Sequence, residues 1–289
     1  MNATLHLVVT MVLCALVVRP LAAARWVWRS PRTGILLWQL LGLTFLLCAV
    51  GAALTHGLAP YDRDVPTALG RLLAGASVQL GPDRVTALMV AALLTIVLVE
   101  MVVLSWLAVL GARRRHRQVL AIVGREDPAA PGALILDHPV TVAYCLPGRR
   151  STVVLSSGAL AALSPAELAA VLAHEHTHAR ERHDLVLLPF TALRRLPLVG
   201  MAAEAVALLV EMRADDGACR AGRAAELATA LRRFGAGRPP AGALSIADRA
   251  VAARLYRLTS SEPLSRGFRW LVLTAGAVLV STPLSFLMI

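Results

Sequence analysis

The segment with the clearest chemical potential reads His174-Glu175-His176-Thr177-His178, an H-E-x-x-H pattern. A helix turns about 100° per residue, so positions 174 and 178 are about 40° apart and their imidazoles project from one face. Two such imidazoles can bind one Zn²⁺. Glu175 is adjacent to the first ligand, where it can take a proton from a water activated by the metal and return it to a leaving amine. The pattern predicts a hydrolytic zinc site with His174 and His178 as ligands and Glu175 as general base.

A helix must position this pattern, and the preceding residues contain a helix start. Residues 164–167 read Ser-Pro-Ala-Glu, with Ser at the N-cap, Pro at the first helical position and Glu three residues after the cap. This arrangement is a capping box. Leu168, Val171 and Leu172 then form one apolar face. We expect a single helix to run from this start through the H-E-x-x-H residues.

A third ligand is predicted on a downstream helix. Glu211 follows His178 by 33 residues, and Asp215 follows Glu211 by four, so the two acids share a helical face. Two His and one Glu leave a fourth coordination position for water. Glu204, seven residues earlier on roughly the same face, is the rival ligand, and Glu211 is favoured. Asp215 is then expected to orient a ligand imidazole through its second ring nitrogen.

The other polar residues near the pattern are expected to have different roles. His176 is two positions from each ligand and should point away from the metal, toward the surface. His183 and Asp184 follow about one turn later, and Asp184 is expected to cap or brace the helix end. The four Cys contain no C-x-x-C pair, so neither a disulfide framework nor a Cys zinc site is expected.

The composition of the 289-residue chain is that of a membrane protein. Hydrophobic residues make up 57% and charged residues 16%, against roughly 25% charged in an average soluble domain. Mean hydropathy is +0.66. The net charge is +11 and every basic residue is Arg. The lack of Lys excludes a P-loop ATPase, a Schiff-base enzyme and a Ser-x-x-Lys acyl enzyme. The Arg residues are spread at membrane edges without an aromatic platform, so no direct nucleic-acid binding is expected.

A bilayer core requires about 20 apolar residues in a helix. Four stretches are predicted to span it: 2–18, 35–56, 85–111 and 270–289. The first could instead be a cleaved signal peptide, because small residues follow it at 22–24. Glu100, the one charged residue of the third stretch, either has a function or pairs locally near an interface.

The Arg distribution predicts the orientation in the plasma membrane. Segment 19–34 contains four Arg and no acid, and the third stretch is followed by an Arg-rich run at 113–117, whereas Arg and Asp balance in 57–84. The positive-inside rule therefore places 19–34 and 112–269 in the cytoplasm, with 57–84 and both termini outside. The predicted organisation is a three-span region over 1–111, a cytoplasmic domain over 112–269 and a fourth span over 270–289.

The cytoplasmic domain is predicted to combine helices with a small β-sheet. After a linker at 124–133, a strand is expected over 134–145, a turn at Pro147 and Gly148, and a partner strand over Ser151–Leu155. Residues 185–212 are read as two helices touching the membrane surface, with a spanning hairpin as the alternative. A helix over 221–234 precedes a flexible stretch at 235–242. The fold class is thus a mainly α membrane protein with an α+β zincin-like domain.

This order of features resembles the BlaR/MecR-type membrane metallopeptidases, the antirepressor proteases of bacterial beta-lactam signalling. The specific part is roughly 150–220, with its Ser-Pro-x-Glu helix start, H-E-x-x-H, the run Arg182-His183-Asp184, and Glu211-x-x-x-Asp215. The resemblance implies a cytoplasmic zinc protease domain between the third and fourth spans that destroys a transcriptional repressor. It also implies that His174, His178 and Glu211 bind Zn²⁺ and that Glu175 is the general base.

The chain departs from that family in its sensor. Full sensor-transducers carry an extracellular penicillin-binding domain after the fourth span, whereas this chain ends at Ile289 and has no Ser-x-x-Lys element. Direct acylation by a beta-lactam is therefore not expected, and segment 57–84 is the sizeable outside segment left for sensing. Membrane proteases of the heat-shock quality-control type and CAAX-type prenyl proteases share the Glu-x-x-x-Asp element, so they remain alternatives.

Three functions follow from these residues. The first is a membrane-embedded zinc endopeptidase that cleaves a regulatory protein at the cytoplasmic face, with the strand Ser151–Leu155 pairing with the extended substrate. The second is a quality-control protease with broad substrates and the same site. The third is a non-catalytic signal transducer that retains zinc as structure. The presence of Glu175 argues against the third, because a structural site has no need of a base.

Overall fold

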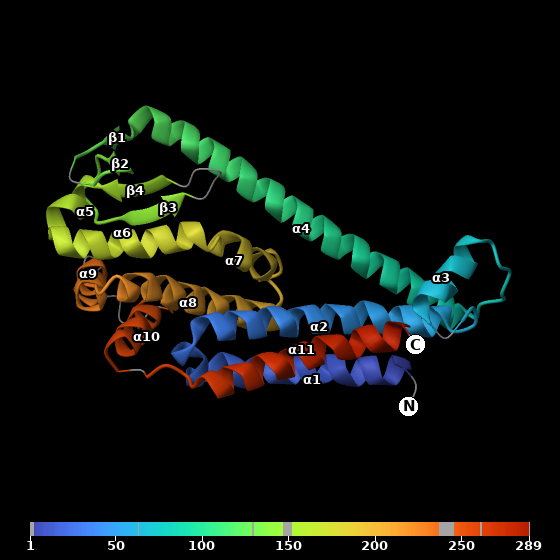
Figure 1. Ribbon diagram of the computed structural model, residues 1–289. Coiled ribbons are helices and arrows are strands. Elements are labelled where there is room, and N and C mark those ends of the chain that lie inside the picture. Colours follow the sequence, from blue (N-terminus) through green and yellow to red (C-terminus); the bar gives the residue numbers. More distant parts are fainter. Residues whose placement is uncertain are drawn as a thin grey trace. The chain divides into compact units, whose positions relative to one another are not determined.

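A computed structural model describes residues 3–62, 64–128, 130–146, 152–236, 246–260 and 262–288 (Figure 1). The chain divides into two compact units, and each is described by itself. The first comprises Met1–Leu104, Ala192–Ala203 and Leu264–Ile289, and the second comprises Ser105–Thr191 and Glu204–Pro263.

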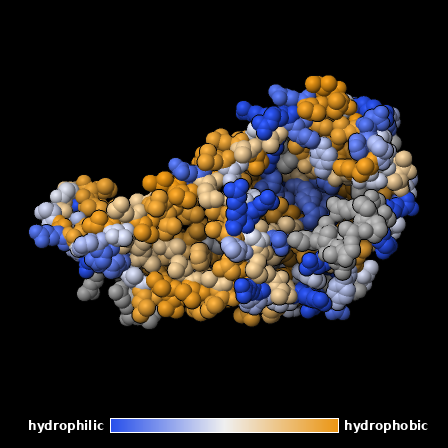
Figure 2. All heavy atoms as spheres, turned by 180° about the vertical axis from the view of Figure 1, so that it is seen from behind, coloured by the Kyte–Doolittle hydropathy of each residue, from blue (hydrophilic) through white to orange (hydrophobic). Residues whose placement is uncertain are grey.

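The first unit is built from apolar helices. Four helices are long and apolar enough to cross a membrane, by length and composition: α1 (Ala3–Ala23), α2 (Pro31–Leu58), α4 (Pro82–Val123) and α11 (Arg266–Met288). Each of the four predicted spans falls on one of them, apart from residues 2 and 289, which lie outside the described residues. The part of α4 that follows Leu104 belongs to the second unit. Helices α1 and α11 pack against α2, and Leu7, Cys48 and Ala52 form a buried cluster there. Figure 2 shows hydrophobic residues covering a large part of the surface on the face that it presents.

Two shorter elements connect these helices. A 3₁₀ helix, η1 (Arg25–Arg29), joins α1 to α2, and helix α3 (Val65–Leu73) lies within the predicted outside segment 57–84. The Asp64 carboxylate caps α3 by accepting a hydrogen bond of 2.7 Å from the Thr67 backbone N–H. On α4, the Glu100 side chain is exposed.

The second unit contains a four-stranded sheet in the order β1-β2-β4-β3. Its strands are β1 (Arg125–Glu126), β2 (Ala133–Leu136), β3 (Ala143–Leu146) and β4 (Thr152–Ser156). Strands β2 and β4 run parallel, with Ile135 opposite Leu155, while β3 pairs antiparallel with β4, with Ala143 opposite Leu155. Strand β4 therefore has a neighbour on each side, and β3 and β1 form the edges.

The sheet corrects two expectations from the sequence. The predicted strand over 134–145 is two strands, because Pro139 lacks an N–H for a ladder and restricts the residue before it. The Ser156 hydroxyl instead donates to the Val140 carbonyl at 2.6 Å and accepts from the Val142 N–H at 2.9 Å. The predicted linker at 124–133 contains β1 and the first residue of β2. The predicted turn at 147–148 and Ser151 lie outside the described residues.

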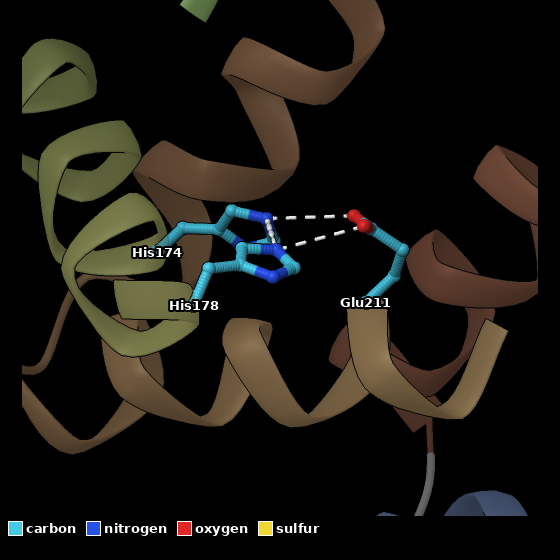
Figure 3. A group of neighbouring side chains, drawn as sticks. All are labelled: His174, His178 and Glu211. Carbon is cyan, nitrogen blue, oxygen red and sulfur yellow. Dashed lines mark hydrogen bonds and ion pairs between the residues drawn. The ribbon is translucent and has the colours of Figure 1, made fainter. Parts of the chain in front are cut away.

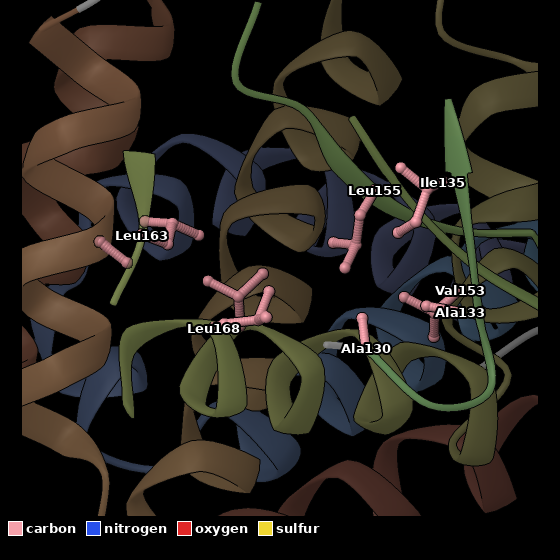
Figure 4. Packing of buried hydrophobic residues seen from close by; sticks show 9 residues of the cluster. Ala130, Ala133, Ile135, Val153, Leu155, Leu163 and Leu168 are labelled. Carbon is pink, nitrogen blue, oxygen red and sulfur yellow. The ribbon is translucent and has the colours of Figure 1, made fainter. Parts of the chain in front are cut away.

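Helix α6 (Pro165–Arg180) packs on one face of the sheet and carries the H-E-x-x-H residues. The buried side chains between them include Ile135, Val153 and Leu155 from the sheet and Leu168 from α6 (Figure 4). The predicted capping box is present. Ser164 Oγ accepts from the Glu167 N–H at 3.3 Å, and Glu167 Oε2 accepts from the Ser164 N–H at 2.7 Å. The cap fixes where α6 begins and the packing fixes which face it buries, so together they set the direction of positions 174 and 178.

Five further helices complete the described chain: α5 (Ser157–Ala162), α7 (His183–Ala192), α8 (Pro197–Arg220), α9 (Ala224–Ala236) and α10 (Ile246–Ser260). The two helices predicted within 185–212 correspond to α7 and α8, and neither is among the helices apolar enough to span a membrane. The helix predicted over 221–234 begins three residues later, as α9. Helix α10 was not predicted. Residues 237–242 of the predicted flexible stretch lie outside the described residues.

Candidate metal centre

Three side chains from two helices converge on one point of the second unit. Figure 3 shows the rings of His174 and His178, both on α6, facing the carboxylate of Glu211 on α8. The two Nε2 atoms are 3.1 Å apart. His174 Nε2 lies 3.4 Å from Glu211 Oε2, and His178 Nε2 lies 3.5 Å from Glu211 Oε1. Each residue thus presents one metal-ligating atom to the same small volume.

The spacing of these atoms fits a zinc ion. In a tetrahedral site with bonds of about 2.1 Å, neighbouring ligand atoms are about 3.4 Å apart. The observed separations of 3.1, 3.4 and 3.5 Å lie close to that value. Two imidazoles and one carboxylate are the donor set of hydrolytic zinc sites, in which water takes the fourth position. The residues present therefore fit the metal that the sequence predicts.

Glu175 lies beside these three residues without joining them. The residue is 9% exposed. It lines a cavity of about 1080 Å³ together with His174, His178 and Glu211. Burial raises the pKa of the Glu175 carboxyl above its ordinary value. A carboxylate with a raised pKa is a stronger base, which is the property that proton transfer from water near neutral pH requires.

Asp215 holds the second ring nitrogen of His174. Its Oδ1 lies 2.9 Å from His174 Nδ1, and the residue is 0% exposed. Because the Nδ1 atom is engaged there, the Nε2 atom remains directed at His178 and Glu211. This is the position that the role predicted for Asp215 requires: a carboxylate that fixes the ring orientation and tautomer of a ligand histidine.

The charges of the site favour a cation. Burial disfavours a proton on His174, but its contacts with Asp215 and Glu211 outweigh burial and raise its pKa to about 9. Burial raises the pKa of Glu211, but His174 and Arg254 outweigh it and lower that pKa to about 2. Burial lowers the pKa of His178 to about 4. A divalent cation bound here displaces the proton on His174, since metal ligands must be deprotonated.

Arg254 on α10 belongs to the site but was not among the residues predicted from the sequence. Its Nε and Nη2 donate to the two oxygens of Asp215 at 3.0 and 2.6 Å, and its Nη1 lies 2.9 Å from Glu211 Oε2. The side chain is buried. A signal was present in the sequence: Arg254 lies on the apolar stripe of Val251, Leu255 and Leu258 at helical spacing. A charged residue on such a stripe predicts a buried partner.

His183 is a second residue of the site, and the sequence assigned it no role. Its Nδ1 lies 2.9 Å from His178 Nδ1, and it is 3% exposed. In a continuous helix, residues five apart are about 140° apart and do not meet. Helix α6 ends at Arg180, and Arg182 has a φ of 51°, a left-handed backbone that turns the chain before α7 begins. Helical spacing alone therefore gave no sign of this contact.

The remaining candidates are not members of the group of ligand atoms. Glu204, the rival third ligand, is exposed on α8. His176 is exposed, as its position between the two ligand histidines predicts. Asp184, in the first turn of α7, forms an ion pair with Arg113. Among the described residues, the group able to hold a metal is His174, His178 and Glu211.

Part of the chain matches a known protein family. Residues 109–252 match the family model described as peptidase family M48. The matched segment is just under half of the chain and contains His174, Glu175, His178, Glu211 and Asp215. No curated protein and no solved structure matches the chain. The match supports a zinc metallopeptidase and adds no support for the BlaR/MecR type specifically.

Proposed function

Since residues 109–252 match the model of peptidase family M48, we propose that the chain is a membrane-bound zinc metalloendopeptidase with His174, His178 and Glu211 as zinc ligands. The observation that carries the proposal is the spacing of the three ligand atoms, 3.1 to 3.5 Å, beside a buried carboxylate that is free of the ligand set. A structural zinc site is closed by four protein ligands, whereas three ligands and an adjacent base are typical of hydrolysis.

Each residue has a distinct part in the proposed reaction. Zinc, when bound, supplies a Lewis acid that lowers the pKa of water and polarises a carbonyl. Glu175 takes a proton from the attacking water and passes it to the nitrogen of the leaving amine. Asp215 keeps His174 Nε2 directed at the ion, and Arg254 keeps the Asp215 and Glu211 carboxylates in place.

The sheet order changes the expected substrate strand. The sequence predicts substrate pairing at Ser151–Leu155, but most of that segment is β4, which has neighbours on both sides. Strand β3 is an edge, and Ala143, Tyr144 and Cys145 from it line the same cavity as His174 and Glu175. An extended peptide that adds to the β3 edge would cross the metal centre with its backbone hydrogen-bonded, as strand addition requires. This mode suits an endopeptidase, because the peptide extends on both sides of the cleaved bond.

The four apolar helices support a position in a membrane, and the Arg-rich segments 19–34 and 113–117 support a cytoplasmic catalytic domain.

For a catalytic domain in the cytoplasm, we favour a regulatory protein, such as a transcriptional repressor, as the substrate. This choice rests on the overall resemblance to the BlaR/MecR layout. A quality-control protease with broad substrates has the same site. Comparing membrane and cytoplasmic proteins from cells with active and Glu175→Gln protein separates the two. One or two accumulating proteins indicate regulation, and many indicate quality control.

The proposal is tested by metal-dependent cleavage. The detergent-purified full chain is incubated with an unstructured protein before chelation, after chelation, and after addition of equimolar Zn²⁺. We expect internal fragments that stop forming on chelation and form again when zinc is restored, because the reaction needs the metal as Lewis acid. Cleavage at the same rate after complete removal of the metal would contradict a metallopeptidase.

A further inference from the structure

We propose that His183 is a positioning residue for the zinc ligand His178, and that the ion pair between Arg113 and Asp184 holds His183 in place. This inference rests on the proposed zinc site. The ion pair connects α4, whose apolar part is a candidate membrane span, to the residue that follows His183. The inference thus links α4 to the metal centre through His183.

The imidazoles of His183 and His178 are in direct contact. Nδ1 of His183 is 2.9 Å from Nδ1 of His178, and the ring planes are at 90°. When His178 offers the lone pair of Nε2 to a metal, its ring proton is on Nδ1. That N–H then donates to His183 Nδ1, which must be a lone pair. His183 is therefore the neutral tautomer with its proton on Nε2, near Glu181 Oε2 at 3.7 Å.

Each of the two ligand histidines has a buried partner at its Nδ1 atom. His174 is held at Nδ1 by the buried Asp215, which Arg254 binds through two hydrogen bonds. His178 is held at Nδ1 by the buried His183. A partner on the second nitrogen of a ligand histidine fixes the tautomer and ring orientation, and its loss typically weakens metal binding about 10–100-fold.

The position of His183 depends on the start of α7 and on the ion pair of its neighbour Asp184. It is the first residue of α7 and follows the left-handed Arg182, so its direction depends on how α7 begins. Its neighbour Asp184 forms an ion pair with Arg113, and both side chains are 15% exposed. Arg113 lies on α4, two residues beyond the predicted span 85–111. A displacement of Arg113 along or around the α4 axis is therefore transmitted to the first turn of α7, and through His183 to His178.

The test measures zinc affinity, by competition with a chelating indicator, on the purified full chain. His183→Leu removes the acceptor, whereas His183→Asn keeps an oxygen close to the position of Nδ1. His176→Leu is the matched control, because His176 is exposed and lies on α6, the helix of the ligand His178. We expect His183→Leu to weaken zinc binding about 10–100-fold, His183→Asn to regain most of the loss, and His176→Leu to bind as the wild type does.

Two further readouts separate positioning from a general loss of structure. The visible absorption bands of the Co²⁺-substituted protein report ligand geometry, and we expect them to shift in His183→Leu and return in His183→Asn. Arg113→Asp should weaken zinc binding, and the exchange Arg113→Asp with Asp184→Arg should restore it. A wild type that binds zinc, together with a His183→Leu variant of unchanged affinity and Co²⁺ spectrum, overturns this inference alone. A folded wild type that binds no zinc overturns the proposed function as well.

Discussion

Replacement of Glu175 by Gln is expected to slow peptide-bond hydrolysis by about 10²–10⁴-fold, the range of general acid–base catalysis, while zinc stays bound. The amide has nearly the same shape as the carboxylate but cannot accept the proton of the attacking water. Glu175 is outside the group of ligand atoms, so the metal does not depend on it. The measurement is the initial rate of cleavage of an unstructured peptide, with the zinc content of the same sample.

The matched control is His176→Gln, one position along the same helix but exposed. It should cleave at the wild-type rate. If Glu175→Gln retained its zinc and cleaved within about twofold of the wild type, Glu175 would not be the general base. The catalytic assignment would then have to move to another group of the cavity.

Arg254→Met is expected to lower the free energy of unfolding of the metal-free protein by about 3–5 kcal/mol, as the loss of one partner of a buried ion pair does. Arg254 is 8% exposed and Asp215 is 0% exposed. Methionine has a similar length but no charge, so the Asp215 carboxylate would remain buried without the two hydrogen bonds that Arg254 donates. Chemical denaturation of the detergent-purified protein, followed by tryptophan fluorescence, measures the change.

Arg249→Met is the control for this variant, because Arg249 is exposed on the same helix. It should change the free energy of unfolding by less than about 0.5 kcal/mol, as surface substitutions usually do. The double variant Arg254→Met with Asp215→Leu should recover part of the loss, because the Asp215 carboxylate is then no longer buried without its arginine partner. Equal stability of Arg254→Met and the wild type would show that the pair does not stabilise the fold.

The local parts of the site could be predicted from the sequence because they follow from helical geometry. The capping box at Ser164 fixes the start of α6, and four-residue spacing places His174 with His178 and Glu211 with Asp215 on common faces. The approach of the two helices was inferred from the chemistry of the ligands rather than from packing. In the structure, the Glu211 carboxylate lies 3.4 Å from His174 Nε2 and 3.5 Å from His178 Nε2.

The non-local parts could not be predicted in the same way. Arg254 reaches Asp215 across 39 positions of sequence, and no spacing rule links residues on helices that far apart. The contact of His183 depends on the left-handed backbone of Arg182, which departs from helical periodicity. Strand sequences indicate strands but not their neighbours, so the interior position of β4 and the edge position of β3 became apparent only in the sheet.

The apolar helices differ from the predicted spans in where they end. Hydropathy locates the segment that suits a bilayer core of about 30 Å, but it does not locate the end of the helix. Helix α4 has 42 residues, which is about 63 Å at 1.5 Å per residue. It continues through the Arg-rich run 113–117 because charged residues do not terminate a helix. That continuation places Arg113 on the same helix as the predicted third span.

The most direct test of the central claim is the metal content of the detergent-purified chain, measured by mass spectrometry. Wild type is compared with His178→Ala, Glu211→Ala and Glu204→Ala. The proposed site predicts about one zinc per chain in the wild type, lost in the first two variants and kept in Glu204→Ala, because Glu204 is exposed and outside the ligand group. A folded wild type without zinc, or zinc that survives Glu211→Ala and is lost in Glu204→Ala, would contradict it.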